Sequence, residues 1–414
     1  MKRKLAVGTA LFIILMLGGW LRVDFLRSVE HDMSPDSINY DAMTRQLLED
    51  GVYGYADTEP NAKITPGFPL FLATVYKLVD YRDHDPLPWV RYAQVLISLA
   101  SLWLIFRITK ELSNDVAGLL SALAAAVYPP FVWANGAVLT EVLGIFFMLG
   151  YVWVQTITFR KQTRPPAFLS GVLLGLTVLV RPEFMPLIVV NYLFFWLLKR
   201  DVKRVLKLFA LTAAGLALVL LPWWARNVVT LNEVVITATQ ANPFKAGTYP
   251  YKNYDDDLVD QNGKTEMEVA VERLKKGFST QPGLYLKWYT IGKLEHIYAS
   301  AYYGGGHQPY HNVLPSSVNP NEFHRWLVFI GLAAAIALAT RWRNTANLLV
   351  VIVVTMTLIR LVFVPEYRYN VMSMPLIIIV ECIVFINVLW WLYGKWGGRK
   401  TGKTRGNHDA ALPV

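Results

Sequence analysis

The chain has little cysteine and little charge. Its 414 residues include a single cysteine, Cys382, and only 17% of them are charged. One cysteine excludes an intramolecular disulfide, a cysteine-ligated zinc cluster and an iron–sulfur site. Soluble domains usually contain about a quarter charged residues, whereas this chain is 54% hydrophobic with a mean hydropathy of +0.34. The composition therefore argues against a soluble protein and predicts an all-α polytopic membrane protein.

The sequence also lacks the short motifs of nucleotide-dependent and hydrolytic enzymes. It contains no Walker loop, no Gly-x-Gly-x-x-Gly after a strand, no Gly-x-Ser-x-Gly and no His-Glu-x-x-His. ATP-driven transport and Rossmann chemistry therefore have no support. His307 and His311 have i,i+4 spacing, but Pro309 separates them and no clear third ligand accompanies them. We predict no cofactor and no metal; a divalent ion stays open, without support in the sequence.

Long uncharged stretches mark the predicted membrane spans. We predict about ten helices, each near the roughly 20 residues that a bilayer requires. They fall in residues 5–21, 92–106, 116–159 (two helices), 165–198 (two helices), 208–225, 326–340, 344–359 and 369–394. Residues 1–20 resemble a signal peptide, but no convincing cleavage site follows them, so they are interpreted as an uncleaved first helix.

Lysine and arginine predict the orientation of these helices. Six short segments hold 20 of the 40 basic residues and only four acids, namely residues 1–4, 107–115, 160–164, 199–207, 341–343 and 395–414. Basic residues accumulate on the cytoplasmic side of membrane proteins, so both termini are predicted to be cytoplasmic. The net charge of +10 is then a topology signal, and nucleic-acid binding is not expected.

Two long segments, residues 24–88 and 226–323, lie outside in this topology. The apolar stretch 64–76 in the first is too short to span and predicts a re-entrant or surface helix. In the second, residues 265–278 have helical spacing, and residues 282–303 are rich in the Tyr, Trp and Lys typical of interfacial helices. Residues 1–394 form the predicted transmembrane domain, and residues 395–414 form a polar tail that is expected to be disordered.

Ionisable residues at membrane depth are costly unless they are paired, so each is a functional candidate. Most of those found here gather at the outer side of the predicted topology, namely Asp36, Asp41, Glu141, Arg181, Glu183, Arg360, Glu366 and Arg368, whereas Glu381 lies inside the last span. Structural roles stay open for them. An aspartate next to Ser34-Pro35 also suits a helix start, arginines also serve as headgroup anchors, and a lone intramembrane glutamate also serves helix packing.

A series of short motifs carries a resemblance to a known family. In chain order they are Pro35-Asp36-Ser-Ile-Asn-Tyr40, Pro66-Gly-Phe-Pro69, Tyr128-Pro129, Thr140-Glu141, Val180-Arg181-Pro182, Leu221-Pro222-Trp223-Trp-Ala-Arg226-Asn227 and Glu366-Tyr-Arg368-Tyr369. In this order, and at these places in the topology, the chain resembles bacterial GT-C glycosyltransferases. The similarity is to family 39, the dolichyl-phosphate-mannose protein mannosyltransferase and aminoarabinose transferase type. It covers about residues 5–375.

The resemblance implies a GT-C arrangement of helices and a reaction at the outer face of a bacterial inner membrane. A sugar passes, with inversion, from a polyprenyl-phosphate carrier to a hydroxyl of an acceptor glycan, lipid or protein. Asp36 matches the general base, and Glu141 matches a second acidic position near the site. The residues that the resemblance assigns to substrate binding are Tyr40, Asp41, Lys63, Arg181, Arg226, Arg368 and Tyr369.

The residue types suit this chemistry, and two other classes of function stay open. An acceptor hydroxyl needs a base within hydrogen-bond reach, and a departing phosphate needs positive charge. A transporter or flippase of lipid-linked sugars is one alternative, although transporters often show matching halves and none is visible here. A surface glycan polymerase or ligase is the other, and it would share the lipid substrate.

Overall fold

The computed structural model describes residues 2–239, 241–301, 315 and 317–400. Every regular element in this part of the chain is a helix, as the composition predicts. The elements are α1 (Lys2–Ser28), α2 (Pro35–Glu49), α3 (Gly67–Leu78), α4 (Leu87–Leu112), α5 (Asp115–Val127), α6 (Pro129–Trp133), α7 (Glu141–Lys161), α8 (Arg164–Val180), η1 (Pro182–Phe184), α9 (Leu187–Lys199), α10 (Val202–Leu231), α11 (Ala241–Gly247), η2 (Pro250–Lys252), α12 (Glu266–Thr280), α13 (Pro282–Lys287), η3 (Trp288–Gly292), α14 (Lys293–Tyr298), α15 (Pro320–Ala339), α16 (Asn347–Val362), η4 (Tyr367–Met372) and α17 (Met374–Lys400).

Seven of the described helical segments are long and apolar enough to cross a membrane. They are α1, α4, α7, α9 with the preceding η1 turn, α10, α15 and α17. The remaining three predicted spans coincide with shorter apolar helices, α5, α8 and α16. The chain is therefore a multi-pass membrane protein, and the predicted number of about ten spans is approximate.

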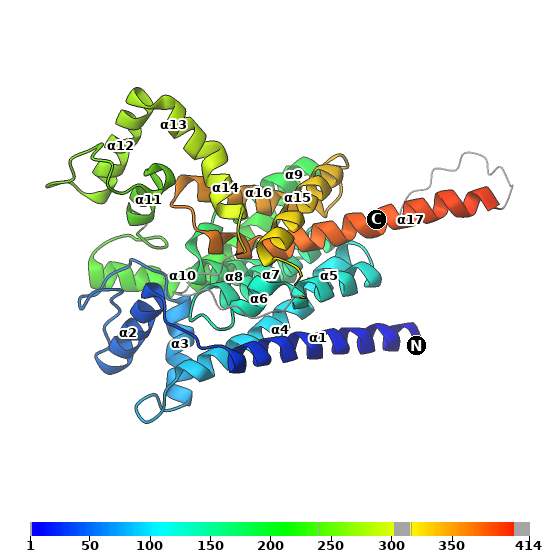
Figure 1. Cartoon of the computed structure of the whole chain (residues 1–414), viewed down its shortest axis with the longest axis horizontal. Helices are drawn as coiled ribbons and strands as arrows, with labels where there is room; N and C mark the ends of the chain where they lie inside the picture. The colour runs from blue at the N-terminus through cyan, green and yellow to red at the C-terminus, as the bar shows by residue number, and fades with distance from the viewer. Residues whose placement is uncertain (1, 240, 302–314, 316, 401–414) are drawn as a thin grey trace.

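The long apolar helices run side by side in one elongated bundle (Figure 1). Small residues allow α8 and α10 to approach closely near the middle of the bundle. A Cβ atom added at Gly171 of α8 would lie 1.9 Å from the Thr212 carbonyl oxygen, and one at Gly215 of α10 would lie 2.3 Å from the Phe168 carbonyl oxygen. Close backbone contact at small residues is a main source of helix association in membranes.

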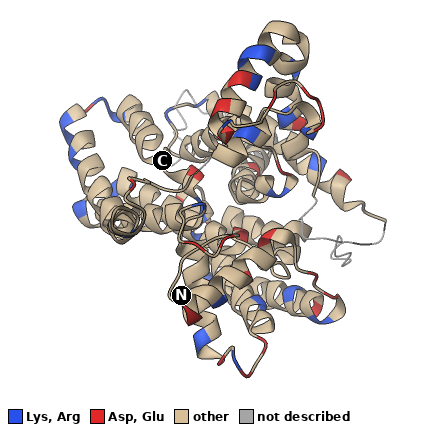
Figure 2. Ribbon diagram, turned by 90° about the vertical axis from the view of Figure 1, so that its left-hand side faces the viewer, with Lys and Arg blue, Asp and Glu red and all other residues tan. Residues whose placement is uncertain are grey.

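The two long segments between spans lie at one end of the bundle, opposite the N-terminus (Figure 1). The first contains α2 and α3, and α3 is the short helix predicted over residues 64–76. The second contains α11 to α14, and its predicted helix 265–278 is α12, which starts at a capping box between Thr265 and Glu268. Figure 2 looks onto this end and shows acidic and basic residues together in the projecting segment at its top.

Most helices extend beyond the predicted spans, and two of these differences concern a candidate residue and the predicted tail. Helix α10 continues to Leu231, so Arg226 lies within a helix and not in the following loop. The indole nitrogens of Trp223 and Trp224 donate to the carbonyl oxygens of Thr237 and Ile236 at 2.6 and 2.7 Å, and they hold the extended helix end against that loop. Helix α17 runs to Lys400, into the predicted tail, and residues 401–414 lie outside the described residues.

The orientation of the bundle is a prediction that labelling can check. A cysteine introduced at Asn262, in the segment before α12, is expected to react with an impermeant reagent added outside the cell. A reporter fused at Gly406 is expected to give the cytoplasmic signal, because basic residues dominate that end. An external signal at Gly406 would mean that an odd number of spans separates the two termini, and it would contradict the predicted topology.

Candidate active site

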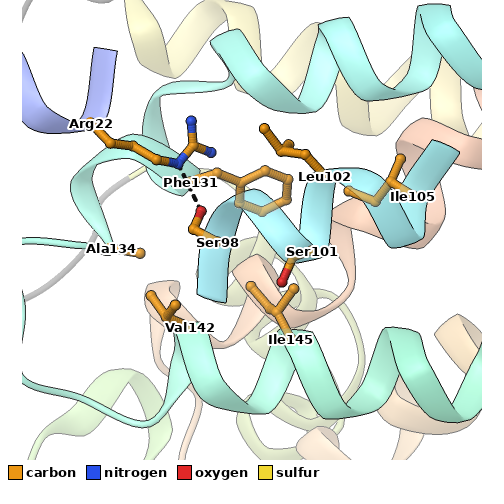
Figure 3. Close-up of a pocket in the computed structure, with 9 residues that line it drawn as sticks. All are labelled: Arg22, Ser98, Ser101, Leu102, Ile105, Phe131, Ala134, Val142 and Ile145. Carbon is orange, nitrogen blue, oxygen red and sulfur yellow. Dashed lines mark hydrogen bonds between the residues drawn. The ribbon is translucent and has the colours of Figure 1, made fainter. Parts of the chain in front are cut away.

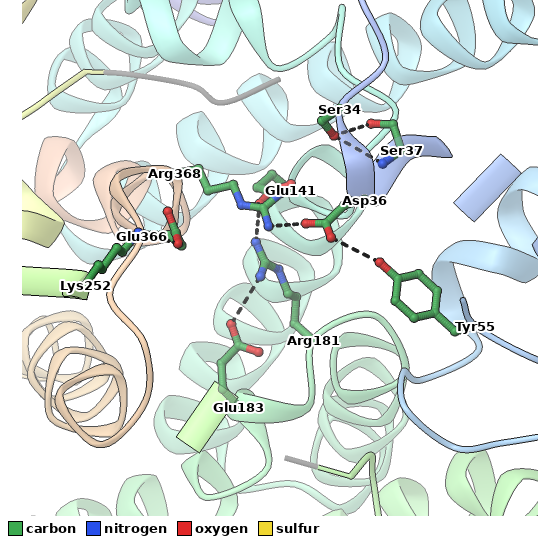
Figure 4. A network of polar contacts seen from close by, with 10 residues as sticks. All are labelled: Ser34, Asp36, Ser37, Tyr55, Glu141, Arg181, Glu183, Lys252, Glu366 and Arg368. Carbon is green, nitrogen blue, oxygen red and sulfur yellow. Dashed lines mark hydrogen bonds and ion pairs between the residues drawn. The ribbon is translucent and has the colours of Figure 1, made fainter. Parts of the chain in front are cut away.

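Four charged residues from distant parts of the sequence meet at the end of the bundle that carries α2. They are Asp36, Glu141, Arg181 and Arg368, called the charged cluster below (Figure 4). Arg368 Nη2 donates to Asp36 Oδ2 at 2.5 Å, and Arg181 Nη2 donates to Glu141 Oε1 at 2.5 Å. Arg368 Nε lies 4.0 Å from the same Glu141 oxygen. Glu141 therefore links the two arginines, and Asp36 lies at the outer side of the group.

Local sequence places Asp36 in the first turn of α2. Ser34 caps the helix, since its hydroxyl accepts from the Ser37 amide at 3.2 Å, and Pro35 occupies the first helical position. Tyr55 Oη donates to Asp36 Oδ1 at 3.1 Å. The Asp36 side chain is 42% exposed, so its carboxylate is both oriented and accessible to solvent.

The Glu141–Arg181 pair is the buried part of the cluster. Glu141 begins α7 and its side chain is 1% exposed, whereas Arg181 follows the last residue of α8. Pro182 ends α8 at this point, because proline cannot continue the helical hydrogen-bond pattern. A Cβ at Gly144, one turn after Glu141, would lie 3.3 Å from Arg181 Cγ. The absence of a side chain there leaves room for the arginine.

Both arginines of the charged cluster keep their charge. Burial by itself lowers the pKa of Arg181 and of Arg368, but the Glu141 carboxylate opposes burial most strongly in both. Glu183, with Oε1 3.8 Å from Arg181 Nη1, and Asp36 act in the same direction, and the pKa of both arginines ends above its usual value. The cluster thus presents two permanent positive charges next to two carboxylates.

Two tyrosines assigned by the resemblance lie next to the charged cluster. The Tyr369 ring centroid is 5.5 Å from Arg181 Cζ and 5.9 Å from Arg368 Cζ. The Tyr40 ring packs 5.3 Å from that of Tyr55, one turn beyond Asp36 on α2. Burial raises the pKa of Tyr40 and of Tyr369. Both hydroxyls therefore stay protonated.

Three residues assigned by the resemblance are not brought to the charged cluster. Asp41 faces α3 and accepts from Tyr76 Oη at 2.5 Å and from Arg45 Nε at 3.2 Å. Five residues correspond to about 1.4 turns of an α-helix. Asp41 therefore lies on a different side of α2 from Asp36. Lys63 pairs with Asp57 at 3.1 Å on the surface.

Arg226 has a different set of contacts. Its Nη1 and Nη2 donate to the carbonyl oxygens of Asn61 and Tyr53 at 2.8 and 3.0 Å, and its guanidinium lies over the rings of Tyr53 and Trp223. These contacts join α10 to the loop between α2 and α3. The geometry therefore favours a positioning role, and the binding role expected of Arg226 stays a prediction.

Sequence reasoning left two features of this region unassigned. Tyr55, which bonds to Asp36, lies 19 residues further along in a loop with no periodic pattern to indicate it. Lys252 Nζ donates to Glu366 Oε1 at 2.6 Å and ties the second long segment to the residues just before Arg368 (Figure 4). Only long-range contacts reveal either residue.

Comparisons with known proteins give the class of fold. Residues 63–225 match the protein family described as dolichyl-phosphate-mannose-protein mannosyltransferase. This stretch contains Glu141 and Arg181, whereas Asp36 and Arg368 lie on either side of it. No match was found among curated protein sequences.

Two solved structures are similar over nearly the whole chain. The archaeal oligosaccharyltransferase AglB from Archaeoglobus fulgidus, in complex with an inhibitory peptide and a dolichol-phosphate, has a TM-score of 0.61 at 13% identity and is matched over 98% of this chain and 53% of its own. ArnT from Cupriavidus metallidurans, bound to undecaprenyl phosphate, has a TM-score of 0.54 at 12% identity, over 93% of this chain and 61% of its own. The chain thus spans about half the length of the archaeal protein.

The fold is that of GT-C glycosyltransferases, as the sequence motifs predict. The charged cluster therefore lies within a fold that is shared with membrane glycosyltransferases. At 12–13% identity the similarity shows the fold alone.

Proposed function

We propose that the protein transfers a sugar from a polyprenyl-phosphate carrier to an acceptor hydroxyl, with inversion, at the outer face of the membrane. The charged cluster carries the proposal, because it joins Asp36 and Arg368 across 332 residues at one end of an apolar bundle. Neighbours of the same fold bind dolichol-phosphate and undecaprenyl phosphate, which supports a lipid-linked donor. A lipid-linked sugar needs both environments found here, apolar helices for its chain and charged groups for its head.

The proposed reaction assigns one task to each part of the cluster. The acceptor oxygen attacks the anomeric carbon from the side opposite the phosphate, and the carbon–oxygen bond to the phosphate breaks. The acceptor proton moves to the Asp36 carboxylate, which is the exposed acid of the cluster. The phosphate leaves with both bonding electrons, and the guanidinium groups of Arg181 and Arg368 stabilise its increased charge.

The Asp36–Arg368 ion pair supports an order of binding. A guanidinium held by Asp36 is not fully available to a phosphate, and a carboxylate held by Arg368 is a poor proton acceptor. A donor phosphate that binds Arg368 competes with Asp36 and frees its carboxylate. In this proposal the donor binds first, and the base becomes active only when there is a sugar to transfer.

A transfer assay with the purified protein tests the proposed reaction. Polyprenyl-phosphate sugars extracted from the host are supplied in detergent, and release of free polyprenyl phosphate is followed by mass spectrometry. A flippase breaks no covalent bond in its lipid-linked substrate. Release of free polyprenyl phosphate that depends on an added envelope extract, the source of acceptor, therefore distinguishes a transferase from a flippase. Absence of release under all donor and acceptor conditions, with donor still bound, would favour the transporter alternative.

Comparison of cells with and without the gene identifies the substrates. Mass spectrometry of envelope glycans and lipids is expected to show the loss of one sugar from an acceptor and accumulation of its lipid-linked form. A polymerase or ligase would change the length or attachment of a whole glycan instead. The hexose or pentose donated by the carrier, and the nature of the acceptor, follow from the masses that change.

We also expect transfer to proceed without a divalent metal. Among the described residues, no group of three or more His, Cys, Asp or Glu side chains is placed to hold an ion; His307 and His311 lie outside those residues. Arginines next to the proposed phosphate position supply the charge that a metal would otherwise provide. Transfer rates measured with and without EDTA should agree within about twofold, well below the effect of a lost general base. Loss of turnover in EDTA, restored by one ion, would contradict the prediction.

A further inference from the structure

Arg22, in the last third of α1, is completely buried and has no described counter-ion. Its side chain is 0% exposed. Nε donates to Ser98 Oγ at 2.7 Å, and Nη1 donates to the carbonyl oxygens of Gly18 and Ala126 at 2.9 and 3.2 Å. Nη2 has no hydrogen-bond partner, and within the described ranges no carboxylate pairs with this guanidinium. Only neutral groups therefore contact a full positive charge.

A small cavity adjoins this guanidinium (Figure 3). Its volume is about 20 Å³, and it lies between α1, α4, α6 and α7. Its polar lining consists of Arg22, Ser98 and Ser101, and the remaining walls are apolar side chains such as Leu102 and Phe131. A single water needs about 10–15 Å³, so the space holds one small guest and is too small for a phosphate or a carboxylate.

The donors around the cavity outnumber the acceptors. Arg22 Nη2 is unpaired. The Ser98 hydroxyl accepts from Arg22, and no described acceptor takes its own hydrogen. Ser101 donates to the Ile97 carbonyl at 3.0 Å. A water molecule would occupy the space but would not neutralise the charge of Arg22. The charge cannot be lost by deprotonation either, because arginine keeps its proton in proteins.

Burying an unpaired charge is far more costly than burying a neutral polar group. A monatomic anion removes that cost, because it occupies the space and neutralises the guanidinium at once. We propose that the cavity binds one chloride ion, with Arg22 Nη2 and the Ser98 hydroxyl as its donors. The site is separate from the charged cluster and does not depend on the proposed transfer reaction.

The bound chloride would act on the start of α7. Val142 lines the cavity and directly follows Glu141, while Ala134 places the end of α6 on the same wall. The ion therefore joins α1 and α4 to the segment that positions the buried glutamate of the charged cluster. Bound chloride is expected to raise the thermal stability of the protein.

Anion exchange on the full-length protein tests the proposal. The protein is solubilised and purified at constant ionic strength in chloride, bromide or gluconate. Chloride and bromide at about 150 mM are expected to raise Tm by roughly 2 °C or more over gluconate, the size expected for one ligand bound well above its Kd. Crystals grown in bromide should show an anomalous peak in the cavity. Equal Tm in all three salts, with no anomalous peak there, would overturn the proposal.

Three variants locate the effect. Arg22→Met removes the charge and should abolish the halide dependence of Tm. Ser98→Ala keeps the charge but removes one donor, so the rise in Tm should require a higher chloride concentration. Arg160→Met is the matched control, because Arg160 is an exposed arginine paired with Glu111, and it should respond to halide as the wild type does. If Arg22→Met does not fold, the Ser98→Ala variant and the anomalous map from bromide crystals still test whether the cavity binds a halide. A halide response retained in Arg22→Met would contradict the assignment.

Discussion

Asp36→Asn is expected to reduce the transfer rate by about 10²-fold or more, the contribution of a general base. Asparagine keeps the size of the side chain and an oxygen that accepts from Tyr55 Oη, but it cannot take the proton of an acceptor hydroxyl. The Asp36–Arg368 pair is partly open to solvent, so its loss should lower stability by no more than about 1 kcal/mol. The measurement combines transfer by the purified variant with Tm and donor binding. Tm is expected to stay close to wild type, and donor binding is expected to be retained or tightened, because an asparagine at this position no longer competes with the phosphate for Arg368.

Asp41→Asn is the matched control for this variant. Asp41 lies on the same helix and also pairs with an arginine, but its partners are Arg45 and Tyr76, outside the charged cluster. It should retain transfer within a few fold. Near-wild-type transfer by the Asp36 variant would exclude this residue as the base and would leave Glu141, the other acid of the cluster, as the remaining candidate.

Much of the fold was predictable because membrane spans are coded locally. An uncharged stretch of the right length has to be a helix in lipid, since no other open structure satisfies its backbone. Each predicted span accordingly lies on a helix, and the short helix α3 and the amphipathic helix α12 also appear where their patterns indicate. Boundaries were less certain, because charge alone does not end a helix. Tertiary contacts of Trp223 and Trp224 hold α10 together beyond the predicted end.

The site was predictable only in part. The motifs indicated Asp36, Glu141, Arg181 and Arg368, and the structure brings these four together. Spacing does not tell which way a neighbouring side chain points, so Asp41 was grouped with Asp36 although it faces α3. The role of Tyr55 depends on where a loop returns to α2. No local pattern encodes such contacts.

Arg368→Lys is expected to lower kcat/KM for the lipid-linked donor by about 10- to 100-fold, equivalent to roughly 1.5–3 kcal/mol for a hydrogen bond to a charged group. An ammonium keeps the charge but cannot contact Asp36, Glu141 and a phosphate along one planar edge, as a guanidinium can. Arg181→Lys should act in the same direction. The loss should appear as a higher KM for the donor together with a lower kcat, because the guanidinium contacts both the bound and the departing phosphate in the proposed reaction. The KM for the acceptor should change less.

Arg45→Lys separates this effect from a general response to losing an arginine. Arg45 forms an ion pair with Asp41 at 3.2 Å, similar in exposure to the Arg368 pair but outside the charged cluster. Donor kinetics of this control should match the wild type. Unchanged donor kinetics in both Arg181→Lys and Arg368→Lys would mean that these arginines only anchor the protein at the lipid headgroups. An effect on donor kinetics in the cluster variants alone would place the donor phosphate where Asp36 now holds Arg368. In the proposed reaction, displacement of that ion pair is what frees the base.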